Sequence, residues 1–220
     1  MNEKIISKIK KNKITTIIGK NGCGKTTLAK NLKQDNNIVL LKREIDKIEY
    51  LTILEVIKIY SKLSKKEIEE KVKETKNIIN LSEILNYSFD KLIDSKKNII
   101  VVLSSLYSKK EMIILDNNLN NVDNQTKTKL FKYMKQTKKT IINITNDVEE
   151  SVYGDYLILI NEKEIVLNNN IKTAFKQEKL FKNNNLELPF MASLSLKLGY
   201  YDLIDNIYLD MNKLVNKLWK

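Results

Sequence analysis

The chain has 220 residues, enough for one α/β domain and a small appendage. No apolar run reaches the roughly 18 residues of a membrane span, no signal peptide is expected after Met1, and a single cysteine excludes an internal disulfide. A net charge of +12 leaves three alternatives, a solvated basic surface, an anionic membrane face or a nucleic acid, and the even spread of lysines favours the first.

The first predicted elements are a strand, a loop and a helix that together form a phosphate-binding motif. Residues 14–18 are apolar or β-branched, as in a buried strand, and residues 26–32 are predicted to be helical. The intervening loop fits the Walker A pattern G-x-x-x-x-G-K-T, in which glycines and a helix amino terminus turn N–H groups toward phosphate. The motif predicts ATP binding by Gly19, Asn21, Gly22, Cys23, Gly24, Lys25, Thr26 and Thr27, with Lys25 on the β- and γ-phosphates and Thr26 on Mg²⁺.

The remaining elements predict a parallel α/β core. Residues 37–41 form the second predicted strand, residues 51–57 open a helical region, and apolar spacing predicts helix within 65–86. Four further strands are predicted at 112–115, 140–145, 156–160 and 164–167. Strands that alternate with helices around a phosphate loop favour a parallel sheet.

From residue 173 the pattern changes to short helical pieces, which predicts a boundary near residue 170. We therefore divide the chain into an ATP-binding domain at 1–172, with a helical subdomain at about 50–106, and a C-terminal helical segment at 173–220.

A second phosphate-site element follows the first by about 90 residues. The apolar strand 113–115 ends at Asp116, as in a Walker B motif, and this acid is predicted to bind Mg²⁺ together with Thr26.

These motifs resemble the ABC ATPase family over residues 5–175. Residues 51–57 (LTILEVI) are similar to the segment after the Q-loop, Val122-Asp123 to the end of the D-loop, Thr145-Asn146-Asp147 to the Thr-His-Asp switch, and residues 154–166 to the strand pair that follows it. The resemblance implies a P-loop NTPase fold of ABC type, with a parallel core sheet, a reduced antiparallel β-subdomain and a helical signature subdomain.

The tail is similar to the C-terminal segment of energy-coupling-factor (ECF) transporter ATPases. That resemblance implies an ATP-binding subunit of an importer for a vitamin or metal ion, placed on the cytoplasmic face of the membrane. Its expected partners are a second ABC-type ATPase subunit, in a homodimer or heterodimer, and integral membrane subunits, with no nucleic acid. For residues 173–220 two alternatives stay open, a dimerisation element or a segment that packs on its own core.

Several departures from the family predict impaired hydrolysis. Asn117 stands where the family has its catalytic glutamate and Asn146 where it has the switch histidine, and an amide cannot act as a general base. The signature LSGGQ aligns with residues 92–96 (LIDSK), and the Q-loop glutamine with Lys42. Only 17 residues separate Lys25 from Lys42, so most of the antiparallel β-subdomain is expected to be missing.

Two other functions remain as alternatives. One is a nucleotide-sensing regulatory pseudo-ATPase without a transporter. The other is an ABC-type factor that acts on nucleic acid or ribosomes, a class that usually carries a second ATPase domain or a long coiled-coil insertion.

Overall fold

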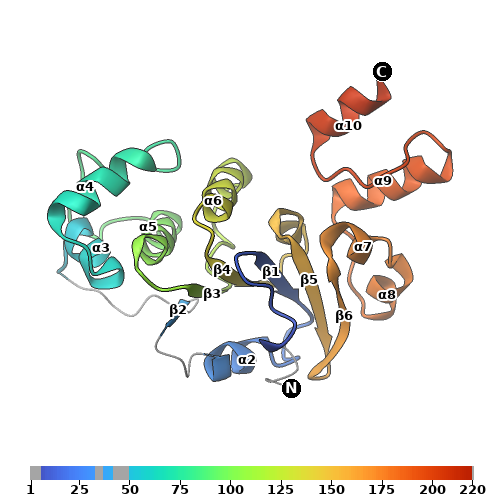
Figure 1. The fold of residues 1–220 in the computed structure, drawn as a ribbon, viewed down its shortest axis with the longest axis horizontal. Helices are drawn as coiled ribbons and strands as arrows, with labels where there is room; N and C mark the ends of the chain where they lie inside the picture. Colours follow the sequence, from blue (N-terminus) through green and yellow to red (C-terminus); the bar gives the residue numbers. More distant parts are fainter. Residues whose placement is uncertain (1–5, 33–36, 42–49, 220) are drawn as a thin grey trace.

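The computed structural model describes residues 6–32, 37–41 and 50–219, and its centre is a six-stranded sheet of order β2-β3-β4-β1-β5-β6 (Figure 1). Parallel pairing joins β2 (Ile38–Leu41), β3 (Met112–Asp116), β4 (Thr140–Ile144), β1 (Ile14–Ile18) and β5 (Tyr156–Asn161) in that order. The edge strand β6 (Glu164–Asn170) is antiparallel to β5. This is the mostly parallel α/β sheet that the sequence predicts.

Helices cover both faces of the sheet, as Figure 1 shows. Helix α2 (Lys25–Leu32) packs on one face, where Leu28 and Ala29 join a buried cluster with isoleucines of the strands. The other face carries α5 (Asp94–Tyr107) and α6 (Asn124–Gln136). Because β-branched residues fill both faces of the central strands, the sheet is buried on both sides, as parallel sheets usually are.

The helical lobe consists of α3 (Ile53–Ser61), α4 (Lys65–Glu74) and the adjoining α5. The sequence predicts helix within residues 65–86, but α4 covers only Lys65–Glu74 and the following residues form turns. Thr75 is the C-cap of α4, and its hydroxyl bonds both the Lys71 carbonyl at 2.9 Å and the Tyr107 hydroxyl at 2.6 Å. Apolar residues after Thr75 still enter the core, without helical geometry.

The C-terminal segment is built from α7 (Ile171–Phe175), α8 (Glu178–Asn183), α9 (Phe190–Tyr200) and α10 (Met211–Leu218). Its buried side chains share one cluster with strand residues, the members including Ile18, Leu157, Leu159, Phe175, Phe181, Ala192 and Ile207. Much of the segment therefore packs on the sheet of the same chain. The outer surface of α10 keeps Val215, Leu218 and Trp219 exposed.

Among the described residues, no helix combines the length and the apolar character that crossing a bilayer requires.

Candidate functional site

The phosphate loop connects the carboxyl end of β1 to the amino end of α2, and its backbone requires glycine. Gly22 and Gly24 have φ values of 79° and 102°, in the left-handed region that side chains disfavour. A Cβ atom on Gly19 would lie 2.3 Å from the Ile160 carbonyl oxygen and 2.8 Å from the buried Cys23 Sγ. Glycine at position 19 is therefore fixed by close packing against β5, and the loop shape follows from the sequence.

Lys25 lies at the centre of the loop and is 6% exposed. Its Nζ donates hydrogen bonds to the carbonyl oxygens of Gly19 at 2.6 Å and Lys20 at 2.9 Å. No carboxylate of the described residues forms an ion pair with it. A buried ammonium group whose partners are neutral carbonyls is well suited to a phosphate group, because a charge-assisted hydrogen bond is stronger than a neutral one.

Asp116 ends β3 at the same edge of the sheet as the phosphate loop, and it is 5% exposed. Its backbone N–H donates to Asn118 Oδ1 at 2.8 Å, which fixes the turn after the strand. Thr26 and Thr27 are exposed in the first turn of α2, and Asn21 is exposed in the loop. Mg²⁺ in nucleotide sites is held by one or two protein oxygens plus phosphates and water, so a Thr26 hydroxyl and an Asp116 carboxylate fit this ion.

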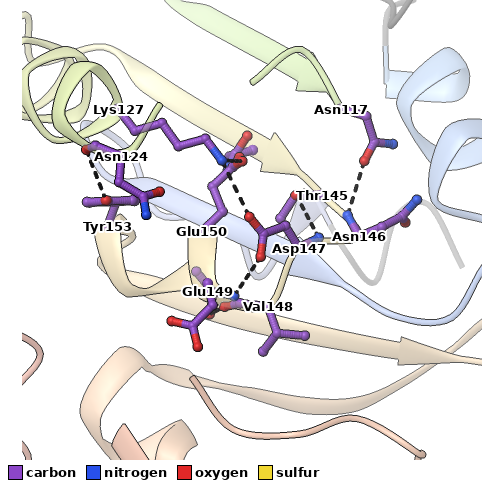
Figure 2. Close-up of polar contacts among 12 residues, drawn as sticks. Asn117, Asn124, Lys127, Thr145, Asn146, Asp147, Val148, Glu149, Glu150 and Tyr153 are labelled. Atoms are coloured by element: carbon purple, nitrogen blue, oxygen red, sulfur yellow. Dashed lines mark hydrogen bonds and ion pairs between the residues drawn. The ribbon is translucent and has the colours of Figure 1, made fainter. Parts of the chain in front are cut away.

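The structure brings together the two asparagines that the sequence assigns to catalytic positions (Figure 2). Asn117 Oδ1 accepts a hydrogen bond from the Asn146 backbone N–H at 3.1 Å, and Asn117 Nδ2 donates to Asp116 Oδ1 at 3.2 Å. Asn117 has a φ of 57°, which asparagine tolerates better than most residues. Its amide thus joins the Asp116 carboxylate to the switch segment 145–147 and offers no group that could take a proton from water.

Figure 2 shows a buried ion network that the sequence analysis missed. It connects helix α6 to Asp147 of the switch segment and to Glu150, three residues later. Lys127 of α6 is 3% exposed, and its Nζ lies 3.1 Å from Glu150 Oε2 and 3.4 Å from Asp147 Oδ2. Glu150 Oε1 accepts from Asn143 Nδ2 at 2.7 Å. The sequence did contain one signal, because Asp147, Glu149 and Glu150 have no lysine or arginine near them in sequence. A buried acid in this run therefore needs a cationic partner from another element.

Protonation in this network follows from burial and charge together. Burial raises the pKa of Glu150, and the Lys127 ammonium opposes that rise. Burial alone would lower the pKa of Lys127, but the carboxylates of Glu150 and Asp147 outweigh it and raise that pKa. Lys127 therefore remains charged at neutral pH and anchors the residues that follow Asn146.

The segment aligned with the signature lies at the amino end of α5, which begins at Asp94. Ile93 is 64% exposed, and Asp94 is exposed next to it. An acid in the first turn suits the helix dipole, but it would repel a polyphosphate bound at this surface. Lys42 lies outside the described residues.

Comparison with known proteins shows which of them the chain resembles. No protein-family model matches it. An ABC transporter ATP-binding protein of Clostridium acetobutylicum is 26% identical over an alignment of 221 positions, gaps included, which covers 85% of this chain and 79% of that protein. An ECF transporter ATP-binding protein of Leuconostoc mesenteroides is 25% identical over 238 aligned positions, covering 92% and 86%. Another, of Malacoplasma penetrans, is 21% identical over 244 aligned positions, covering 96% and 85%.

Solved structures agree with this likeness at the level of the fold. A dimeric bacterial ABC transporter cassette superposes with a TM-score of 0.62 at 17% identity, covering 74% of this chain and 88% of that one. A nucleotide-free ATP-binding cassette from an ABC transporter gives 0.60 at 17% identity, covering 80% and 85%. The chain therefore has the P-loop fold of an ABC ATPase cassette and resembles in sequence the ATP-binding proteins of ABC transporters, those of energy-coupling factor transporters included.

Proposed function

We propose that the chain is the ATP-binding subunit of an ECF-type membrane importer, and that it binds Mg-ATP at an interface with a second ATPase subunit but hydrolyses it slowly. The observation that carries this proposal is a contrast between two residues of the candidate site. Lys25 is buried with carbonyl partners, which suits a phosphate group, whereas the position aligned with the catalytic glutamate holds an amide, Asn117, whose oxygen accepts from the Asn146 backbone N–H.

Binding is assigned to the loop and the two oxygen ligands. The loop N–H groups and Lys25 would hold the phosphates, and Mg²⁺, when bound, neutralises charge on them. Thr26 and Asp116 present the oxygens for that ion at the carboxyl edge of the sheet. Burial of Lys25 strengthens its contact with phosphate, because water does not screen it there.

Slow hydrolysis follows from the hydrogen bonds of Asn117. General-base catalysis needs a group that accepts a proton from the attacking water, and an amide oxygen does not. The Asn117 oxygen is also occupied by the Asn146 backbone N–H, so the residue acts as a link between Asp116 and the switch segment. The chain would then respond to ATP by binding it, with the closed dimer favoured because ATP contacts both subunits.

Assembly would use two surfaces. The segment 120–123 and the start of α5 would face the second ATPase subunit in the presence of ATP. Residues 173–220, proposed as a separate C-terminal segment, would add a contact that does not need nucleotide, through the exposed apolar residues of α10. Integral membrane subunits would hold the pair at the inner face of the membrane. The relatives that support this part of the proposal are named as ATP-binding proteins of energy-coupling factor transporters.

Purification of the tagged full-length chain from its own cells in mild detergent, followed by mass spectrometry, tests this function. We expect a polytopic membrane protein and a second ATPase that carries an intact Walker B glutamate, both retained through size exclusion. A chain that elutes alone would instead favour the nucleotide-sensing regulator, and elution with ribosomes would favour the ribosomal factor. Either result would contradict the proposed transport function.

A further inference from the structure

A pocket of about 600 Å³ lies at the edge of the sheet opposite to the phosphate loop. Its floor is formed by the amino ends of four neighbouring strands, β2, β3, β4 and β1. Its lining includes five lysines and one acid, namely Lys11, Lys109, Lys110, Lys138, Lys139 and Glu111. We refer to it as the amino-edge pocket. The phosphate loop follows the other end of β1, roughly 15 Å away at about 3.3 Å per strand residue, so the two sites are distinct.

The parallel sheet explains why these lysines meet. Parallel strands begin at the same edge, so residues just before each strand are brought together although they are far apart in sequence. Lys109 and Lys110 precede β3, Lys138 and Lys139 precede β4, and Lys11 precedes β1. Five lysines that are far apart in sequence are therefore brought to one edge of the sheet.

The density of positive charge is higher than the composition explains. Five of the eleven lining residues are lysine, whereas the overall share of Lys and Arg, 39 of 220, would place about two there. Lys11, Lys109 and Lys138 are exposed, and none of these three forms an ion pair with a described residue. Among the described lining residues, Glu111 is the one acid. The pocket therefore carries a net positive charge of about four, which attracts anions.

The floor of the pocket is held by hydrogen bonds between the strand ends. The Asn12 backbone N–H donates to Thr140 Oγ1 at 3.0 Å, and the Thr140 N–H donates to the Glu111 carbonyl at 3.0 Å. Lys139 Nζ donates to the Ser108 carbonyl at 2.7 Å and also to the Lys110 carbonyl. Burial lowers the pKa of Lys139, with only the Glu111 carboxylate acting against it. A preformed floor with such a partly buried ammonium favours a bound anion over diffuse counterions.

The lining also restricts the kind of anion. None of the described lining residues is aromatic, so they offer no stacking surface for a nucleobase. Lysine recognises phosphate as a point charge, and a pocket of several hundred Å³ has the size of a small-molecule site. We propose that the amino-edge pocket is a second anion site, which binds a small molecule through several adjacent phosphate groups.

Inorganic tripolyphosphate in Mg²⁺-free buffer is the probe for this site. The phosphate loop also attracts polyphosphate, so calorimetric titrations are run on the full-length chain with Lys25→Ala, which weakens the loop. The pocket variant adds Lys109→Gln and Lys138→Gln, two exposed positions, and the matched control adds Lys197→Gln and Lys213→Gln, exposed lysines of the C-terminal segment that do not line the pocket. Circular dichroism checks that each variant is folded.

We expect one tripolyphosphate per chain in the Lys25→Ala protein, at least tenfold weaker binding in the pocket variant, and unchanged binding in the control. Orthophosphate should bind at least tenfold more weakly than tripolyphosphate. Hydrogen exchange should show protection in the segments just before β1, β3 and β4. Loss of all binding with Lys25→Ala alone, equal weakening in the pocket variant and the control, or orthophosphate binding as tight as tripolyphosphate would each overturn the proposal.

Discussion

Lys25 is buried in its own loop, where its ammonium group donates to the Gly19 and Lys20 carbonyl oxygens and to Cys23 Sγ, all of them uncharged partners. Lys25→Ala removes the charge-assisted contact with phosphate, which is worth about 1.5–3 kcal/mol, or roughly 10- to 150-fold in Kd. Lys20→Ala is the matched control, because Lys20 is exposed and only its backbone carbonyl bonds Lys25. Calorimetric titration with Mg-ATP measures both variants, and equal affinities would exclude the loop as the binding site.

At Lys127 the structure predicts an effect on stability. Lys127→Met leaves the Glu150 carboxylate buried without its cation, which destabilises a protein by about 3–5 kcal/mol. Lys135→Met on the same helix breaks an exposed pair with Asp155 and should change stability by less than about 1 kcal/mol. Adding Glu150→Gln to Lys127→Met should recover part of the loss.

Urea unfolding of these variants gives the comparison for the Lys127 network. A loss at Lys127 no larger than the loss at Lys135 would mean that the buried network does not anchor the switch segment.

Among the elements, the contact between α4 and α5 predicts a dependence on alkaline pH. Burial raises the pKa of Tyr107 to about 12, so the folded state favours the neutral phenol. This contribution to stability is fully present below the unfolded pKa of about 10 and is lost as the pH rises toward 12. Between pH 9 and pH 11 the wild type should therefore lose about 1–1.5 kcal/mol more than Tyr107→Phe.

Urea unfolding at the two pH values measures that difference. Tyr87→Phe is the control, because Tyr87 is 63% exposed. Between the two pH values Tyr87→Phe should lose as much unfolding free energy as the wild type. An equally large loss in Tyr107→Phe would contradict the prediction.

Local patterns predicted most elements because short-range chemistry decides them. The six strands are rich in β-branched residues, and the glycines of the phosphate loop mark a tight turn in which the backbone takes positive φ values. The extent of α4 was overestimated, because apolar residues continue at nearly helical spacing after Glu74, while the cap residue Thr75 is bonded to Tyr107, 32 residues later. The Lys127 network and the amino-edge pocket were missed for the same reason, since each joins residues from separate elements.

On the scale of the whole molecule, the C-terminal segment has an inner and an outer surface. Phe175 and Phe181 are fully buried against the sheet, so deleting the segment would expose the core. A more specific variant is Val215→Ser with Leu218→Ser and Trp219→Ser, which changes only exposed positions of α10 and of its C-cap residue, Trp219. It should weaken assembly with the second ATPase in the absence of nucleotide, because the proposed interface would bury less apolar surface.

Light scattering of the copurified pair, with and without Mg-ATP, follows that assembly. The control replaces Tyr50 and Tyr87 by serine, exposed aromatics at the opposite end of the molecule. A pair that stays as stable in the α10 variant as in the control would exclude α10 as a nucleotide-independent contact.

The central claim is that the chain binds Mg-ATP but hydrolyses it slowly. Its most direct test is phosphate release by the purified full-length chain at saturating Mg-ATP, with bound nucleotide determined on the same sample. We predict about one ATP per chain and a turnover well below the usual enzyme range of about 1 per second or more. Turnover of about 1 per second or faster that Lys25→Ala abolishes would contradict the account.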